Sequence, residues 1–258
     1  ENLVLNMNGG DDSFSATGNL AALIGVTVDG GAGNDRILGG NGVDTLLGGD
    51  GNDFIDGNQG NDIAFLGAGD DVFQWDPGDG SDIVEGQAGF DTELFNGSAG
   101  NEVMALRANG GRATLTRDLG NIVMDNNGVE RFDINALGGT DNIAVRDLSG
   151  TDVQEVRISL AGTIGGTTGD GQADTVQLDA DFEISDYMPV RGIATCGWRG
   201  RSFSLGIADS VTVLARTAAM ADFSPRRSLG SSSSNIRSLR VSGASSRVSV
   251  RKRSGRDS

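Results

Sequence analysis

The chain has 258 residues, of which 42 are glycine and only 3 are proline, and its formal net charge is −16. So much glycine without proline favours repeated tight turns over a proline-rich linker. The absence of histidine excludes histidine-based acid–base catalysis and histidine metal ligands, and the lone Cys196 excludes an internal disulfide.

Apolar residues form no run of 18 or more, so we expect no transmembrane segment. No signal peptide is recognisable, and a first residue of Glu1 rather than Met predicts a fragment of a longer protein. Charge also divides the chain, because residues 1–186 carry 33 acidic and 7 basic side chains whereas residues 187–258 carry 3 and 13. This asymmetry indicates different partners or a different origin for the two parts.

The first 29 residues predict a flanking β coil, in which short strands are joined by turns rich in Gly and Asp. Residues 5–14 match residues 134–143 in the spacing of a Gly pair and one aspartate, Asp12 or Asp141. We therefore expect a longer, irregular version of one coil on both sides of the central region.

A nine-residue tandem repeat fills residues 30–74, reading GGAGNDRIL, GGNGVDTLL, GGDGNDFID, GNQGNDIAF and LGAGDDVFQ. A fixed period indicates a stacked architecture. The Gly-rich first part of each unit must turn sharply, and its last three residues form a short strand. Two units make one coil of 18 residues that stacks on the next at about 4.8 Å. Ile37, Ile55 and Phe73 should line one wall of the core, and Leu46 and Ala64 the other.

The pattern loosens after Gln74 but continues to residue 94. Asp82 and Asp91 follow the corresponding aspartates at steps of 20 residues, which predicts one coil widened by two residues near Trp75. Glu93 occupies a core position, where a carboxylate is costly unless it is paired, so we expect the regular stack to end or distort there. Residues 95–186 alternate apolar and polar side chains and predict a broader β-solenoid or a sandwich.

Stacking places the repeat aspartates in two opposed columns. Two carboxylates about 4.8 Å apart in water repel by about 1 kcal/mol, so a cation between successive turns would favour folding. Ca²⁺ accepts 6–8 oxygen ligands, including backbone carbonyls, whereas Mg²⁺ requires a near-ideal octahedron and retains its waters. Zn²⁺ is disfavoured because the repeat contains neither His nor Cys. The columns therefore predict calcium sites.

The GGxGxD motif, with an apolar residue two positions after its aspartate, resembles the RTX, or haemolysin-type, calcium-binding nonapeptide repeat over residues 30–94. The resemblance implies an all-β fold, a right-handed parallel β-roll or β-solenoid. We expect wider solenoid-like or sandwich-like flanks and a disordered C-terminal tail. It also implies a protein secreted from bacteria that binds several Ca²⁺ ions and folds when it meets external calcium.

Carried onto this sequence, the resemblance implies side-chain ligands at Asp35, Asp44, Asp53, Asp62 and Asp71, followed by Asp82 and Asp91. It implies carbonyl ligands at Gly31, Gly33, Gly40, Gly42, Gly49, Gly51, Gly60 and Gly69. The three best sites are expected between Asp35 and Asp53, between Asp53 and Asp71, and between Asp44 and Asp62. No catalytic residue is predicted, because the acidic pairs occupy repeat positions.

The basic tail, residues 187–258, is rich in Ser and Arg and cannot bury enough apolar surface to fold alone. Three interpretations compete: binding to an anionic surface, an inert disordered tail, and translation of the gene in the wrong frame. Translating the coding DNA in the other two frames beyond residue 180 would separate them.

The leading hypothesis for the whole chain is a non-enzymatic, secreted calcium-binding module whose folding is coupled to calcium. One alternative is a structural or adhesive β-solenoid that binds a cell surface or a polysaccharide. Another is an ancillary module of an exported hydrolase. No nucleic acid partner is expected for the folded part.

Overall fold

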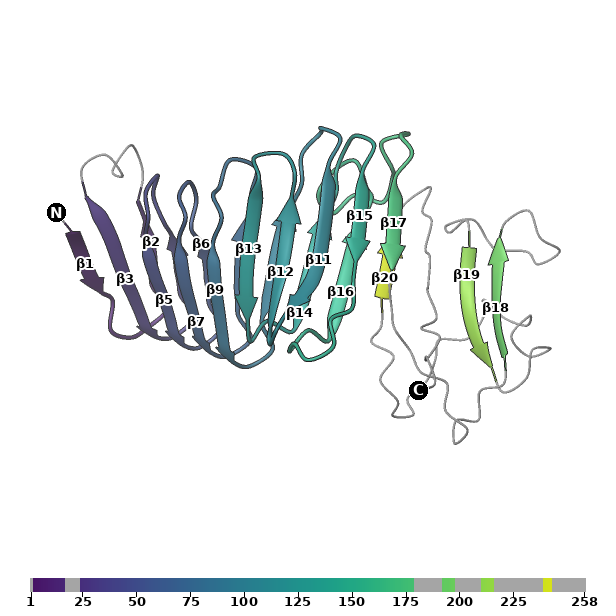
Figure 1. Ribbon diagram of the computed structural model, residues 1–258. Coiled ribbons are helices and arrows are strands. Elements are labelled where there is room, and N and C mark those ends of the chain that lie inside the picture. The colour runs from purple at the N-terminus through teal and green to yellow at the C-terminus, as the bar shows by residue number, and fades with distance from the viewer. Residues whose placement is uncertain (1, 17–23, 179–191, 198–209, 216–238, 243–258) are drawn as a thin grey trace.

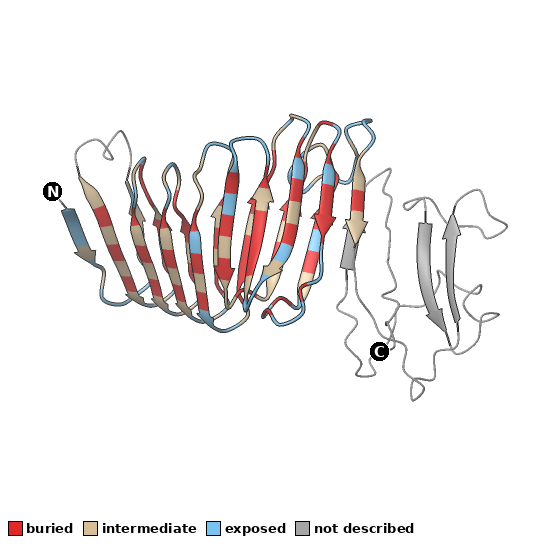
Figure 2. Cartoon of the chain, in the orientation of Figure 1, coloured by how far each residue is buried: buried red, intermediate tan, exposed pale blue. Residues whose placement is uncertain are grey.

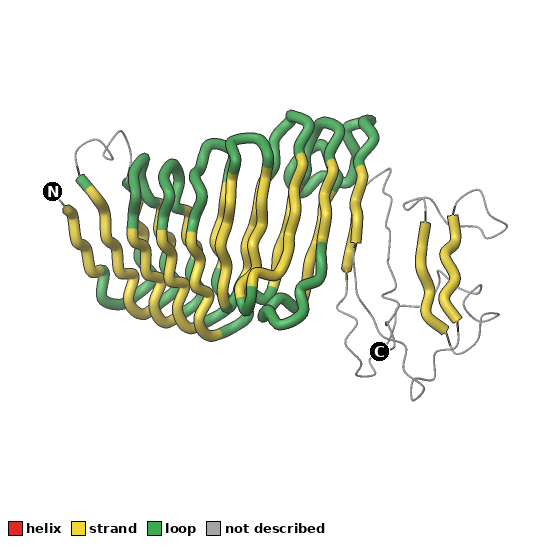
Figure 3. Tube along the Cα trace, viewed as in Figure 1, coloured by secondary structure: helices red, strands yellow, loops and turns green. Residues whose placement is uncertain are grey.

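The computed structural model describes residues 2–16, 24–178, 192–197, 210–215 and 239–242, and every regular element in these ranges is a β-strand (Figure 1). None of the described residues forms a helix long and apolar enough to cross a membrane. Figure 3 shows the chain winding through strands and turns as successive coils of a solenoid. The predicted all-β parallel β-roll is therefore confirmed.

Two sheets form the walls of the solenoid. The ten-stranded sheet has the order β1(Asn2–Asn6), β3(Gly25–Ala32), β5(Thr45–Asp50), β7(Ile63–Ala68), β9(Ile83–Ala88), β13(Ile122–Asn127), β12(Arg112–Arg117), β11(Val103–Asn109), β15(Asn142–Val145) and β17(Thr175–Leu178). The eight-stranded sheet has the order β2(Ser13–Ser15), β4(Arg36–Leu38), β6(Phe54–Asp56), β8(Val72–Trp75), β10(Thr92–Asn96), β14(Arg131–Asn135), β16(Glu155–Ser159) and β20(Leu239–Ser242).

The tight repeat forms the predicted 18-residue coils. Ile37 pairs in parallel with Ile55, and Ile55 with Phe73, along the eight-stranded sheet. Leu46 pairs with Ala64 in the facing sheet. All five side chains are fully buried, and Figure 2 shows buried residues alternating with partly exposed ones along the strands of the repeat. The predicted two walls of the core are thus confirmed.

The widened coil also lies where the spacing predicts it. Ile63 pairs with Ile83 and Val72 pairs with Thr92, which are steps of 20 residues in both sheets. The Trp75 ring is fully buried and stacks on Phe95, with 4.2 Å between ring centroids. Its indole N–H donates to the Gly80 carbonyl at 2.8 Å, which ties the extra turn to the core.

An antiparallel meander interrupts the ten-stranded sheet directly after β10. Strands β11, β12 and β13 pair antiparallel with one another, and this meander pairs in parallel with β9 on one side and β15 on the other. The eight-stranded sheet has only β14 between β10 and β16. The first sheet therefore gains two strands that have no counterpart in the second.

Glu93 lies at the point where the sequence predicts an end or a distortion. Its strand still pairs in register on both sides, with Phe73 and Phe132 as neighbours of Glu93, so the eight-stranded sheet continues and the distortion occurs in the opposite sheet. The side chain is fully buried, and neither carboxyl oxygen has a hydrogen-bond partner. Burial raises the pKa of Glu93 well above its usual range, and the charge of Asp82 raises it further.

Residues 95–178 extend the same two sheets. Most of the predicted disordered or out-of-frame tail, residues 187–258, lies outside the described residues. Within it, β18(Gly192–Gly197) and β19(Ser210–Ala215) pair antiparallel, and β20 pairs in parallel with β16. The three interpretations of the tail remain predictions.

Candidate metal centre

The first aspartate column lies at the turns that lead from the ten-stranded sheet into the eight-stranded sheet. In each turn the backbone N–H of the aspartate donates to the Oδ1 atom of the aspartate in the following coil, at 2.7–3.0 Å. Glu130 continues the pattern by accepting the N–H of Asp91 at 2.8 Å. The column consists of Asp12, Asp35, Asp53, Asp71, Asp91 and Glu130.

The second aspartate column lies at the turns that lead back into the ten-stranded sheet. Asp44 donates its N–H to Oδ1 of Asp62, and Asp62 donates to Oδ1 of Asp82, both at 2.8 Å. The structure therefore brings the predicted side chains together in the two opposed columns that the spacing predicts, and it includes Asp82 and Asp91 in them.

Each column leaves carboxylate oxygens without partners. The Oδ2 atoms of Asp35, Asp53, Asp62, Asp71 and Asp91 are buried and accept no hydrogen bond, although these residues are at most 2 % exposed. In four of these repeats, all but that of Asp71, the Oδ2 atom lies against the first glycine of its own repeat, so that a Cβ at Gly48 would collide with Oδ2 of Asp53. Asp44 differs, because its Oδ2 accepts the N–H of Gly40 at 2.7 Å. Buried, unpaired carboxylate oxygens are costly unless a cation compensates them.

The pKa values of the columns reflect this lack of compensation. Burial raises the pKa of Asp53 to about 6 and that of Asp62 to about 8, partly offset by a backbone N–H and reinforced by neighbouring aspartates. Burial likewise raises the pKa of Asp82 and of Asp91 to about 7, and it raises those of Asp44 and Asp71. A bound divalent cation would stabilise the ionised form of each group and reverse these shifts.

Backbone carbonyls of the predicted glycines point along the stack toward the next coil. An added Cβ at Gly49 would collide with the carbonyl oxygen of Gly31, and one at Gly51 with that of Gly33. An added Cβ in the coil that follows would likewise collide with the carbonyl oxygens of Gly42, Gly49, Gly51, Gly60 and Gly69. Gly40 takes part through its N–H, which donates to Asp44.

These atoms fit calcium better than a metal that needs several side chains. Among the described residues, no three acidic or sulfur ligands converge on one point. Two column aspartates together with backbone carbonyls would form a ligand set that Ca²⁺ accepts readily.

A ladder of exposed side chains beside the first column was missed by sequence reasoning. Asn34 accepts the N–H of Asn52 at 2.7 Å, Asn52 accepts that of Asp70, and Asp70 accepts that of Phe90. The signal is the Asn or Asp that precedes most repeat aspartates. Its side-chain oxygen satisfies a turn N–H of the next coil, which keeps the turns in register beside the candidate sites.

Sequence reasoning also left out Asp12 and Glu130, the two ends of the first column. Asp12 follows Gly9 and Gly10 in an irregular version of the motif, and its Oδ2 atom has no partner. Glu130 lies beyond the meander, 39 residues after Asp91, and no local pattern marks it.

The fold and the two columns define a parallel β-roll with carboxylate-lined turns. A family model described as the RTX calcium-binding nonapeptide repeat matches residues 26–46, 38–73 and 77–105. Residues 26–73 and 77–105 therefore carry RTX calcium-binding repeats. A second family model, described as AbpE bacteria, matches residues 148–224 and thus crosses the boundary at residue 187. The comparison with curated proteins finds no match for this chain.

Replacing Gly49 by alanine should destabilise the fold more than the same change at Gly10. Both glycines have φ of +114°, so both variants bear the backbone cost of a left-handed conformation. A Cβ added at Gly49 would collide with the carbonyl oxygen of Gly31, whereas a Cβ added at Gly10 would have no atom within 4 Å. We expect an additional loss of about 1–3 kcal/mol for Gly49→Ala, measured by urea denaturation in saturating calcium. Equal losses for the two variants would contradict the close approach of successive coils.

Proposed function

We propose that this chain is a secreted, non-catalytic module in which calcium binds between successive coils and drives folding. The observation that carries the proposal is the series of buried Oδ2 atoms without partners in the two columns. Calcium ions bound there would convert stacked, uncompensated charges into ligands shared by neighbouring coils. Binding free energy then becomes folding free energy, because the unfolded chain has no preformed site.

Within this proposal we assign three ion positions, between Asp35 and Asp53, between Asp53 and Asp71, and between Asp44 and Asp62. Side-chain oxygens of these residues would supply the charge. Neutral ligands would come from the backbone carbonyls of Gly31, Gly33, Gly42, Gly49, Gly51, Gly60 and Gly69. Gly40 contributes to the proposed site through its N–H, which donates to the Asp44 carboxylate. Asp82 and Asp91 extend the two columns by one further position each.

Secretion belongs to the same proposal, because extracellular calcium is abundant enough to occupy such sites whereas cytosolic calcium is kept low. A chain that requires calcium to form its columns would stay unfolded before export and fold afterwards. The acidic composition of residues 1–186 supports this order, since the uncompensated charges repel one another in the absence of the ion.

Circular dichroism of the full chain with a chelator and with millimolar calcium tests the coupling. We expect a largely unfolded spectrum in chelator and a β-sheet spectrum in calcium, with magnesium at the same concentration serving as the control ion. The physical reason is that short strands of three to eight residues cannot offset the buried carboxylates alone. A complete β-sheet spectrum in chelator would refute calcium-coupled folding.

A further inference from the structure

A second set of acidic side chains repeats the ladder beyond the meander. Glu102, Asp141 and Asp174 precede β11, β15 and β17, as the second column precedes β5, β7 and β9. Glu102 donates its N–H to Oδ1 of Asp141 at 2.9 Å, and Asp141 donates to Oδ1 of Asp174 at 3.0 Å. We call these three residues the C-terminal acidic ladder. Two of them lie outside the residues that the RTX repeat model matches.

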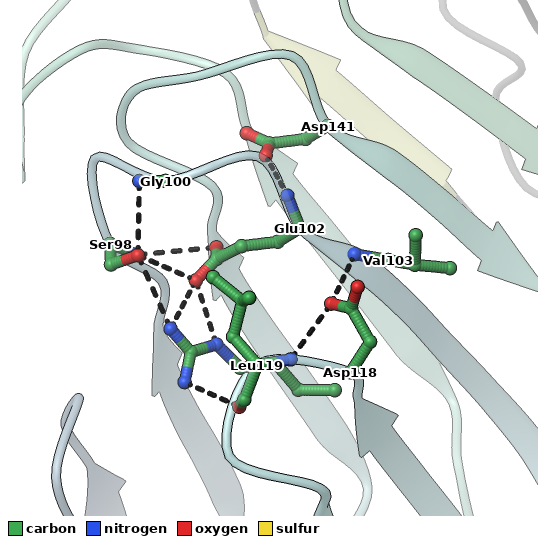
Figure 4. Close-up of polar contacts among 8 residues, drawn as sticks. Ser98, Gly100, Glu102, Val103, Asp118, Leu119 and Asp141 are labelled. Atoms are coloured by element: carbon green, nitrogen blue, oxygen red, sulfur yellow. Dashed lines mark hydrogen bonds and ion pairs between the residues drawn. The ribbon is translucent and has the colours of Figure 1, made fainter.

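The first member of this ladder already has a positive partner. Figure 4 shows the carboxylate of Glu102 turned toward an arginine and toward Ser98. Arg117, which comes from the meander, donates to Oε1 of Glu102 through Nε at 2.7 Å and through a second guanidinium nitrogen. Ser98 donates its hydroxyl to the same oxygen at 2.8 Å. The side chains of Arg117 and Glu102 are 7 % and 0 % exposed, so this ion pair is buried.

Asp141, one step further along the ladder, has no such partner. The residue is 2 % exposed, and its Oδ2 atom is buried and accepts no hydrogen bond. Burial raises the pKa of Asp141 to about 7, a backbone N–H lowers it, and the charges that act on it are those of Asp174, Glu102 and Asp170, all negative. Asp141 thus resembles the repeat aspartates, because it has a buried Oδ2 atom without a partner and a raised pKa, although its turn lacks the repeat sequence.

The surrounding turns supply further oxygen atoms. The carbonyl of Gly100 points at Gly139 of the next coil, where an added Cβ would collide with it, as the Gly42 carbonyl points at Gly60. Asp170 reaches the same turn and accepts the N–H of Gly139 at 2.7 Å. Since no three acidic side chains converge anywhere in the described part of the chain, carbonyls or water must complete a site here. Such a set of hard oxygen ligands suits calcium.

We propose that Asp141 and Asp174 bind one further divalent cation of the calcium class, at a site beyond the RTX repeats. Arg117 takes the place of the cation at Glu102, so that the meander and its internal ion pair lie between the two sets of metal sites in the ten-stranded sheet. The choice of calcium as the ligand rests on the proposed function, whereas the choice of Asp141 and Asp174 as the binding residues rests on the hydrogen bonds of the C-terminal acidic ladder.

Calcium stoichiometry of the full chain tests this site. Equilibrium dialysis against calcium should show one ion fewer per chain for Asp141→Asn and for Asp174→Asn than for the parent. Asp152→Asn removes the same charge from an exposed position of the same region and should leave the stoichiometry unchanged. Circular dichroism in calcium establishes that each variant is folded. Asp174 is only partly buried, so Asp174→Asn decides the question if Asp141→Asn does not fold.

The outcomes separate this site from the proposed function. A parent chain that binds no calcium would overturn both. A parent that binds several ions, together with two folded variants of undiminished stoichiometry, would overturn only the Asp141 site. In that case the carboxyl group of Asp141 would be a buried, protonated group with a purely structural role.

Discussion

Asp53→Asn should stabilise the chain in chelator and destabilise it in calcium. Without a cation, the carboxylate at Asp53 is buried between two like charges, and its pKa is raised to about 6 by burial, then by Asp71 and Asp35 against a favourable backbone N–H. Asparagine keeps an oxygen that can accept the N–H of Asp35 but removes the charge. In calcium the same change removes a ligand charge from two of the three proposed sites, so this substitution should have the largest effect of any single repeat aspartate.

The pH dependence of the parent in chelator gives an independent check on the sign. The folded-state pKa of Asp53 lies above its unfolded value of about 3.8, so its favourable contribution is complete below that value. The contribution is lost as pH rises through about 6, because the folded state then has to release a proton that it binds more tightly than the unfolded state. Asp53→Asn should remove this part of the pH dependence.

Calcium titrations at neutral pH, followed by circular dichroism, measure the calcium side of the prediction. We expect the half-saturating calcium concentration of Asp53→Asn to rise on the order of tenfold or more, since ligand charge count tunes affinity. Asp50→Asn is the matched control, because Asp50 lies in the same repeat and is exposed. An equal shift for both variants would mean that net charge, and not the column, controls binding.

Arg117→Met should lower the free energy of unfolding by about 3–5 kcal/mol. We expect this loss in calcium, and also in chelator under conditions in which the region around Arg117 is folded. The substitution leaves Glu102 charged and buried without its guanidinium partner. It also removes a donor to the carbonyl of Leu119 at 2.9 Å and a cation that lies 5.3 Å from the centre of the Trp75 ring. Urea denaturation in saturating calcium measures the loss.

Two further variants make this prediction specific. Arg157→Met removes an exposed arginine that pairs with Glu155, and surface pairs of this kind contribute only about 0–1 kcal/mol. The double variant Arg117→Met with Glu102→Met should recover most of the lost stability, because a buried ion pair can be replaced by apolar side chains at little cost. A double variant as unstable as the single one would show that Arg117 acts through packing on Trp75 and not through Glu102.

The spacing of the repeat was sufficient to predict the core and both columns. A fixed residue period determines which side chains share a wall of the core, so the sequence alone places Ile37, Ile55 and Phe73 together, as the strand pairing does. The step of 20 residues likewise located the widened coil at Trp75. These features depend only on counting along the chain.

The meander and its ion pair could not be predicted in this way. Alternation along β11, β12 and β13 indicates strands but does not encode whether neighbours run parallel or antiparallel. The pairing of Arg117 with Glu102 depends on the meander folding back, which is a contact without a local sequence signal. Glu93 marks an irregular core position in the sequence, but its own eight-stranded sheet stays regular. The irregularity is the antiparallel meander β11–β13, which lies in the ten-stranded sheet that faces it.

The hydrogen-bond ladder of the first column has a direction, and this makes the two ends of the β-roll chemically different. Every aspartate N–H is satisfied by the coil that follows it, up to Glu130, whose own N–H turns back to the carbonyl of Asp91 at 3.2 Å. A chain cut at any internal coil would therefore leave N–H donors at one cut face and carboxylate acceptors at the other. The aspartate N–H of each coil is therefore satisfied only when the following coil is in place, and its Oδ1 atom only when the preceding coil is.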